Sequence, residues 1–157
     1  MKSFDLQNIL NNIIGLHLTD IKHACEMLMF HFDKYAIHAR CLTRIIKEDD
    51  ILLTTADYQS WDGKNDKNND EWYNIDKYKS SIEGGTVVSV EVNKLCDLYI
   101  TLDNNVTIQI IIQSGYSHYD EEREQYRFFE IGADDETEEQ AQQRKHYVVY
   151  NKHIEID

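Results

Sequence analysis

Five charged or titratable side chains in predicted strands could together hold an anionic ligand. In one strand, alternation places His38, Arg40 and Arg44 on the same face. Asp57 follows in the returning strand, and Arg127 lies in a strand much later in the chain. Cations gathered on an acidic protein could bind an anion, whereas cross-strand carboxylates could neutralise them in ordinary ion pairs. Both interpretations of this cluster stay open at the level of sequence.

The other chemistry-bearing residues lack the spacing that catalysis or metal binding needs. Cys41 stands three residues from His38, so on a strand the two side chains face opposite sides and form no nucleophile pair. Possible metal ligands are scattered along strands or wrongly spaced for a calcium loop: His17, His23, His31, Asp62, Asp66 and Asp70. The chain has no glycine-rich phosphate loop, Gly-x-Ser-x-Gly or Cys-x-x-Cys motif. We therefore expect no enzyme activity, no cofactor and no bound metal.

Negative charge is the strongest signal in the composition. The formal net charge is −13, and residues 114–140 contribute −8 of it through ten acidic residues and two arginines. The candidate partner-binding carboxylates form two runs: Asp120, Glu121, Glu122 and Glu124, then Asp134, Asp135, Glu136, Glu138 and Glu139. Such a surface attracts a basic protein partner and repels nucleic acid and anionic membranes. The alternative is that the charge serves solubility alone.

The best-determined elements are three strands at residues 85–92, 96–102 and 106–112. They are rich in Val, Ile and Thr, and connections this short join only antiparallel neighbours. The Asp103-Asn104-Asn105 connection suits a tight turn, because Asn and Asp tolerate a left-handed backbone. Alternation assigns one face of each strand to the core: Val88, Val90 and Val92; Leu98, Ile100 and Leu102; and Val106, Ile108, Ile110 and Ile112.

The remaining segments are expected to form further strands, short helices and polar loops. Residues 4–14 predict an amphipathic helix that stops at Gly15. Residues 16–22 and 27–32 favour two strands with a turn near Cys25, although residues 18–32 also fit one long helix. Further predicted elements are strands at 36–46 and 51–57, a polar loop at 60–70, one or two helical turns in 72–82, an acidic loop at 114–124, a strand at 126–131, a helical stretch to 144, and a hairpin of 147–150 with 153–156.

Length and composition favour one domain, residues 1–157, with an α+β fold. We expect the N-terminal helix to pack on a curved, mostly antiparallel sheet or half-barrel of about nine or ten strands. Three separated cysteines, Cys25, Cys41 and Cys96, favour free thiols in a reducing compartment. No run approaches the ~18 apolar residues of a membrane span, and the N-terminus does not resemble a signal peptide. The expected location is the cytoplasm.

The order of several short segments resembles a family of small uncharacterised bacterial cytosolic proteins. The segments are Ile14-Gly15, MLMF at 27–30, HARCLTRI at 38–45, Ala56-Asp57, CDL at 96–98, QYRFF at 125–129 and HYVV at 146–149. Proteins of that kind are similar to the immunity proteins of polymorphic toxin and contact-dependent growth inhibition systems. The resemblance implies a non-catalytic protein that neutralises a cognate toxin domain by stoichiometric binding.

Charge supports the same expectation from a different direction. Secreted toxins are often nucleases with basic substrate-binding surfaces, which clustered carboxylates and aromatic anchors would complement. Two alternatives stay open. One is a small-ligand-binding or regulatory module that uses the sheet face around His38, Arg44 and Arg127, and the other is an acidic inhibitor that mimics nucleic acid. The sequence leaves the oligomeric state undetermined.

Overall fold

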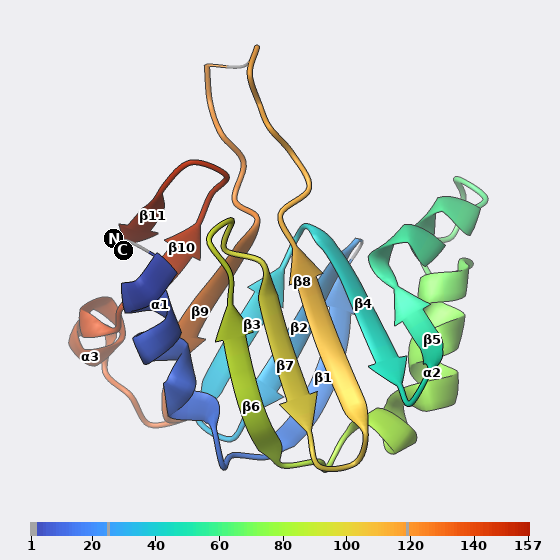
Figure 1. Ribbon diagram of the computed structural model, residues 1–157, viewed down its shortest axis with the longest axis horizontal. Helices are drawn as coiled ribbons and strands as arrows, with labels where there is room; N and C mark the ends of the chain where they lie inside the picture. The colour runs from blue at the N-terminus through green and yellow to red at the C-terminus, as the bar shows by residue number, and fades with distance from the viewer. Residues whose placement is uncertain (1–2, 25, 119) are drawn as a thin grey trace.

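The computed structural model describes residues 3–24, 26–118 and 120–157, and its fold is α+β. Within those residues, eleven strands form two antiparallel sheets that stack face to face and do not close into a barrel (Figure 1). The six-stranded sheet has the order β1 (Leu18–Ala24), β2 (Met27–Phe32), β3 (Tyr35–Ala39), β9 (Tyr126–Glu130), β10 (His146–Val149) and β11 (Ile154–Ile156). The five-stranded sheet has the order β5 (Asp50–Thr54), β4 (Leu42–Lys47), β8 (Val106–Ile111), β7 (Leu98–Leu102) and β6 (Val87–Val92).

The strand predicted at 36–46 is wrong in one important respect, because the chain breaks there and changes sheet. β3 ends at Ala39 in the six-stranded sheet, and β4 begins at Leu42 in the five-stranded sheet. The backbone amides of Arg40 and Cys41 both donate to the carbonyl of Gln125, at 2.8 and 3.1 Å. In a regular strand, successive amides point to opposite sides, so two that share one acceptor mark a sharp bend.

The predicted three-stranded meander is confirmed as β6, β7 and β8. Ile100, Ile108 and Ile110 are fully buried, as alternation predicts. The prediction for Val88 is wrong: its side chain is 53% exposed, and Val87 lies in the core instead. The reason is a register shift between Val87 and Ser89 against β7, which turns the first residues of β6 over.

Both sheets contribute to a single hydrophobic core. Phe30, Phe32 and Ile37 from one sheet join Ile45 and Ile108 from the other in the same buried cluster. The strands predicted at 16–22 and 27–32 are confirmed as the β1–β2 hairpin, which excludes the alternative of one long helix. The part of their predicted turn at residue 25 lies outside the described residues. The predicted C-terminal hairpin is confirmed as β10 and β11.

Two helices close the edges of the sheets with side chains that imitate a neighbouring strand. In α1 (Ser3–Leu10), the Gln7 amide donates to Val90 O at 2.9 Å and accepts from Val92 N at 2.7 Å on the edge strand β6. In α2 (Asp70–Ile82), Lys79 donates to Ile21 O at 2.9 Å on the edge strand β1. These bonds occupy backbone groups that would otherwise pair with another chain.

The remaining helical segments are short, and they correct two predictions. α1 continues as the 3₁₀ helix η1 (Asn11–Ile13), and Gly15 follows with φ 84°, as expected of a helix stop. α2 has 13 residues rather than one or two turns. The strand predicted to reach Asp57 ends at Thr54, where the 3₁₀ helix η2 (Thr55–Ser60) begins. Near the C-terminus, α3 (Glu138–Gln143) confirms the predicted helical stretch. No helix in the described part of the chain is long and apolar enough to cross a membrane.

Candidate functional site

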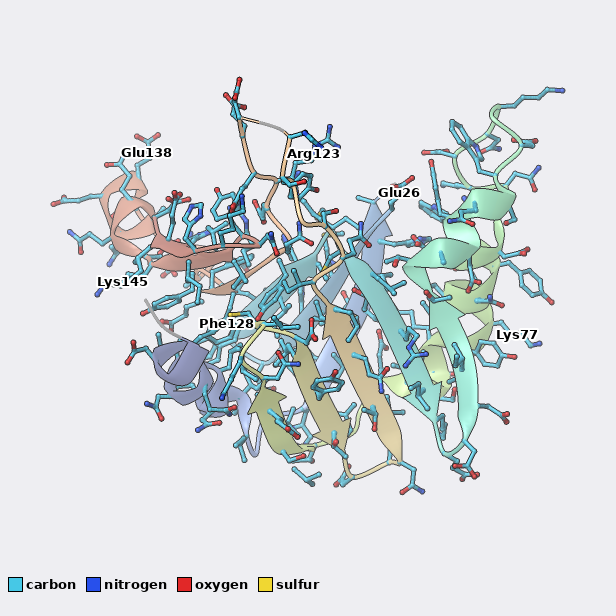
Figure 2. The ribbon with its side chains drawn as sticks, turned by 45° about the horizontal axis from the view of Figure 1, so that its top comes forward. Glu26, Lys77, Arg123, Phe128, Glu138 and Lys145 are labelled. Carbon is cyan, nitrogen blue, oxygen red and sulfur yellow. The ribbon has the colours of Figure 1, made fainter. Side chains whose placement is uncertain are left out.

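An open cleft of about 900 Å³ lies where the chain crosses between the two sheets. One crossing is the β3–β4 bend at Arg40. The other is the loop between β8 and β9, whose described residues, 112–118 and 120–125, project beyond both sheets (Figure 1). Figure 2 shows Glu26 and Arg123 on separate projections at this end of the molecule. Strand alternation cannot predict this site, because its residues lie where the strands stop.

Gln125 holds the two crossings together. Its backbone carbonyl accepts hydrogen bonds from the backbone amides of Arg40 and Cys41. Its own backbone amide donates to Val149 O at 2.8 Å. Its buried side chain accepts from Gln113 N at 3.3 Å and donates to Arg123 O at 3.1 Å. This residue was absent from the sequence-based candidates. A buried amide between two polar loops gives no signal in the sequence until the loops are known to meet.

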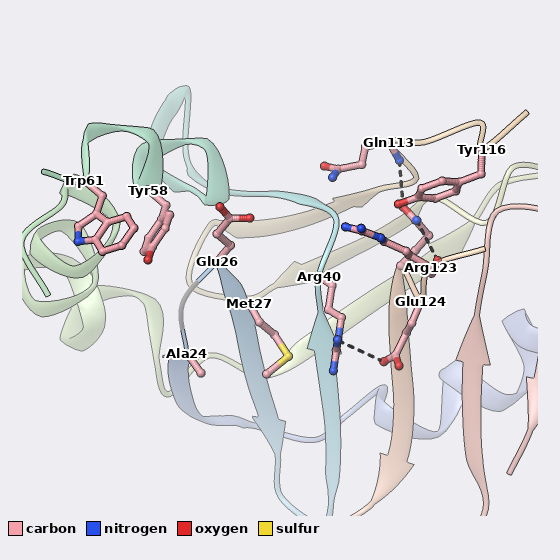
Figure 3. Close-up of a pocket in the computed structure, with 11 residues that line it drawn as sticks. Ala24, Glu26, Met27, Arg40, Tyr58, Trp61, Gln113, Tyr116, Arg123 and Glu124 are labelled. Atoms are coloured by element: carbon pink, nitrogen blue, oxygen red, sulfur yellow. Dashed lines mark hydrogen bonds and ion pairs between the residues drawn. The ribbon is translucent and has the colours of Figure 1, made fainter. Parts of the chain in front are cut away.

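Arg40 and Arg123 line the cleft on the side of the loop (Figure 3). Arg127, on the adjacent strand, holds both oxygens of Glu124, with Nε to Oε1 at 2.6 Å. Burial would raise the pKa of the Glu124 carboxyl, but Arg127 and then Arg40 hold that pKa below its usual value. Arg40 reaches Glu124 only at 4.0 Å and is 58% exposed, and no salt bridge joins Arg123 to a described carboxylate. Both guanidinium groups therefore keep most of their charge available.

Aromatic rings form the opposite wall. Tyr58 and Trp61, from η2 and the residue after it, are stacked with centroids 5.6 Å apart. The Trp61 indole donates to Asn65 O at 2.7 Å, which fixes the ring although it is 39% exposed. In Figure 3, Tyr58 lies on the cleft side of this pair, and Glu26 and Met27 lie between it and the arginines.

The predicted cationic cluster is not assembled as one site. His38 and Arg127 are cross-strand neighbours on the six-stranded sheet, and Glu124 contacts Arg127 and Arg40 at its rim. Arg44 belongs to the other sheet; because Thr43 and Ile45 beside it are buried, it points to the opposite outer face, where it donates to Gln109 at 2.9 Å. Asp57 caps η2 by accepting from Thr54 N at 3.0 Å.

The outer face of the six-stranded sheet carries three histidines, two of which contact Phe129 while His31 lies beside His38. The Phe129 ring stacks on His146 at 4.5 Å and meets the edge of His38 at 4.9 Å. Burial, then the charges of His31 and Arg127, lower the pKa of His38 to about 4. Burial also lowers the pKa values of His31 and His146. These shifts favour the neutral form of all three rings.

The acidic residues divide into paired and unpaired groups. Glu122 contacts His153 at 3.1 Å, Glu124 is bound by Arg127, and Glu136 contacts Arg144 at 2.9 Å. The other six predicted partner-binding carboxylates are exposed and form no salt bridge with a described residue: Asp120, Glu121, Asp134, Asp135, Glu138 and Glu139. Glu121 and Glu122 are thus neighbours in sequence with different surroundings.

A buried polar group that the sequence did not reveal lies beneath α2. The Glu71 carboxyl is 0% exposed, and its Oε1 lies 3.6 Å from His23 Nδ1. The His23 ring also contacts Trp72, with centroids 3.5 Å apart. The Glu71 oxygens, His23 Nδ1 and Trp72 Nε1 have no hydrogen-bond partner among the described residues. Burial raises the pKa of the Glu71 carboxyl above its usual value.

The described cysteines are unsuited to nucleophilic chemistry. Cys41 is buried, and burial raises the pKa of its thiol to about 12. Cys96 is half-buried, and burial likewise raises the pKa of its thiol. Cys25 lies outside the described residues. In the described part of the chain, no three His, Cys, Asp or Glu side chains gather closely enough to hold a metal ion.

The fold and this surface define a two-sheet α+β protein with an acidic loop beside an aromatic cleft. Comparison with known proteins found no matching family model, no matching curated protein and no matching solved structure. The function is therefore argued from the surface itself.

Proposed function

We propose that the protein is an immunity protein that neutralises a cognate bacterial toxin domain by binding it in a one-to-one complex. The toxin surface that it covers is basic, as in a nuclease that binds nucleic acid. The observation that carries the proposal is the loop of residues 112–125. It projects beyond both sheets and presents Asp120 and Glu121, unpaired among the described residues, beside the aromatic cleft.

This surface has the two parts that a specific protein interface needs. Exposed carboxylates raise the rate of encounter with a basic partner and orient it. Aromatic rings in a fixed geometry give affinity once water leaves, and Trp61 is held in this way by its bond to Asn65. An inhibitor that acts by covering the binding surface of the toxin needs no catalytic group.

The scaffold also suits a binding protein. Gln125 ties the base of the projecting loop to both sheets, so the acidic tip is carried on a fixed junction. Side chains of α1 and α2 cover the edges of β6 and β1, which limits unintended pairing of strands with other chains. The acidic loop and cleft are therefore the surface we assign to recognition.

The experiment first asks whether a toxin domain is encoded immediately upstream of this gene, and then uses that domain. We expect co-expression of the protein to restore growth of cells that produce that domain. The purified pair should form a one-to-one complex by light scattering, and association should slow as salt rises. A gene neighbourhood with no toxin, or a toxin domain that is neither bound nor neutralised, contradicts the proposal.

A further inference from the structure

The cleft has three kinds of wall, and their chemistry together points to a ligand that is independent of any toxin. One wall is the face of Tyr58, backed by Trp61. A second is the exposed carboxylate of Glu26, which accepts hydrogen bonds and forms no salt bridge with a described residue. The third contains the guanidinium groups of Arg40 and Arg123.

We propose that this cleft binds a small planar ring that carries both an exocyclic amine and an anionic group, as a nucleoside monophosphate does. The ring stacks on Tyr58, its amine donates to Glu26, and its phosphate lies between Arg40 and Arg123. A volume of about 900 Å³ falls within the range of pockets that hold ligands of this size.

The two arginines are available because neighbouring carboxylates, Glu124 and Glu122, are already paired with other residues. Both Glu124 oxygens accept from Arg127, so Arg40 at 4.0 Å gains little from it. Arg123 follows Glu122, but that carboxylate is turned toward His153, at 3.1 Å. A phosphate can accept several charge-assisted hydrogen bonds from such a pair.

The overall charge of −13 does not oppose a ligand of this size. Charges separated by more than ~8 Å are largely screened at physiological salt, so a mononucleotide responds mainly to the groups that line the cleft. A nucleic acid polymer would extend past the cleft and meet the acidic runs. The surface therefore selects a single anionic unit over a chain of them.

The test is calorimetry or ligand-observed NMR on the isolated protein with CMP, UMP and cytidine. CMP and UMP differ at the exocyclic amine, and cytidine lacks the phosphate. We expect saturable binding of CMP that is tighter than that of UMP and of cytidine. Arg123→Gln should weaken CMP by about tenfold, the value of one charge-assisted hydrogen bond, and leave cytidine unchanged. Glu26→Gln should remove the preference for CMP over UMP.

Arg44→Gln provides the matched control, because it removes an arginine from the outer face of the other sheet, and CMP binding should not change. No saturable binding of CMP, equal binding of CMP and cytidine, or an equal effect of the Arg44 and Arg123 variants would overturn the inference. Because no toxin is present, failure here leaves the proposed toxin complex untouched, and failure of that complex leaves this site untouched.

Discussion

The two sheets share one core, yet their outer faces carry different chemistry. The five-stranded sheet presents polar cross-strand pairs, such as Arg44 with Gln109 and Thr101 with Thr107. The six-stranded sheet presents the histidines around Phe129. Both sheets are built largely from strands adjacent in sequence, and each contains one pair of distant strands, β4 with β8 in the first and β3 with β9 in the second. Local patterns therefore describe the hairpins of both sheets, while the pairing of β4 with β8 and of β3 with β9 depends on which distant segments meet.

The cleft belongs to neither sheet alone. It forms where the chain leaves one sheet for the other, at Arg40 and again in residues 112–125. There the regular ladder ends, and polar side chains take over the hydrogen bonding, as Gln125 does. The junctions between the sheets are thus where binding groups can collect without disturbing the core.

The largest effects should come from truncations that test whether the sheets share one core. Ile108→Ala in the five-stranded sheet and Ile37→Ala in the six-stranded sheet should each cost about 2–5 kcal/mol of unfolding free energy. Both side chains are 0% exposed, whereas Ile51, at 54%, is the matched control and should cost under about 0.5 kcal/mol. Urea denaturation measures all three. A small loss at only one core position would mean that the two sheets do not unfold as one unit.

Whether the sequence predicts the position of a residue depends on whether that residue follows the alternation of its neighbours in the strand. Ile108 is predictable, because its strand alternates without interruption and its turn at Asn105 has the expected positive φ, 64°. Val88 is not, because one bulge reverses it. The cationic cluster failed for a similar reason: the bend at Arg40 sends Arg44 to another sheet.

The cleft was harder still to predict. Arg123 lies between two glutamates in the sequence. Its guanidinium group is available because Arg127 and His153 form ion pairs with those glutamates. Glu71 similarly looks like an ordinary acidic residue in the first turn of a helix, where carboxylates are favourable. Only the packing of α2 against β1 buries it beside His23. These properties arise from tertiary contacts, and no local pattern records them.

The next largest effect should come from Glu71→Gln. The folded protein holds the Glu71 proton more tightly than the unfolded chain, since burial raises the pKa of that carboxyl. Stability from that proton is therefore full below its ordinary pKa and is lost as pH rises through the folded pKa. The neutral amide avoids this loss. The variant should therefore gain stability relative to wild type as pH rises above the ordinary pKa of 4.5, by up to about 1–3 kcal/mol, the cost of an unsatisfied buried group.

The control for this experiment is Glu91→Gln, an exposed carboxylate on β6. Because that side chain is exposed, the substitution should change the unfolding free energy by less than about 0.5 kcal/mol. Thermal denaturation at several pH values gives the comparison. A Glu71 variant that loses stability equally at all pH values would show that the carboxylate has a hydrogen-bonded role.

A smaller and opposite pH effect is expected on the outer face of the six-stranded sheet. The folded pKa of His38 is about 4, below the ordinary value of 6.5, owing first to burial and then to the charges of His31 and Arg127. A depressed folded pKa contributes stability above pH 6.5 that is lost as pH falls toward 4. His38→Gln should reduce that acid destabilisation. In NMR titration, the His38 ring should change near pH 4, and a midpoint near 6.5 would refute the assignment.

The smallest effect on stability, and the sharpest test of recognition, should come from the unpaired tip of the acidic loop. Asp120→Asn with Glu121→Gln removes two exposed charges and should change unfolding free energy by less than about 0.5 kcal/mol. The matched control is Glu48→Gln with Asp49→Asn, in the β4–β5 turn at the opposite end of the sandwich (Figure 1). Both variants remove two negative charges, so they differ only in where the charge is removed.

With the toxin domain as partner, stopped-flow association at low salt separates two explanations of the acidic charge. If the loop tip directs association, the Asp120/Glu121 variant should bind roughly two to ten times more slowly, and the Glu48/Asp49 variant should match wild type. The difference should shrink at high salt, because screening removes the field of the loop in wild type as well. Equal rates for the two variants would mean that overall charge, rather than this loop, attracts the partner. The aromatic cleft would then have to supply the specificity by itself.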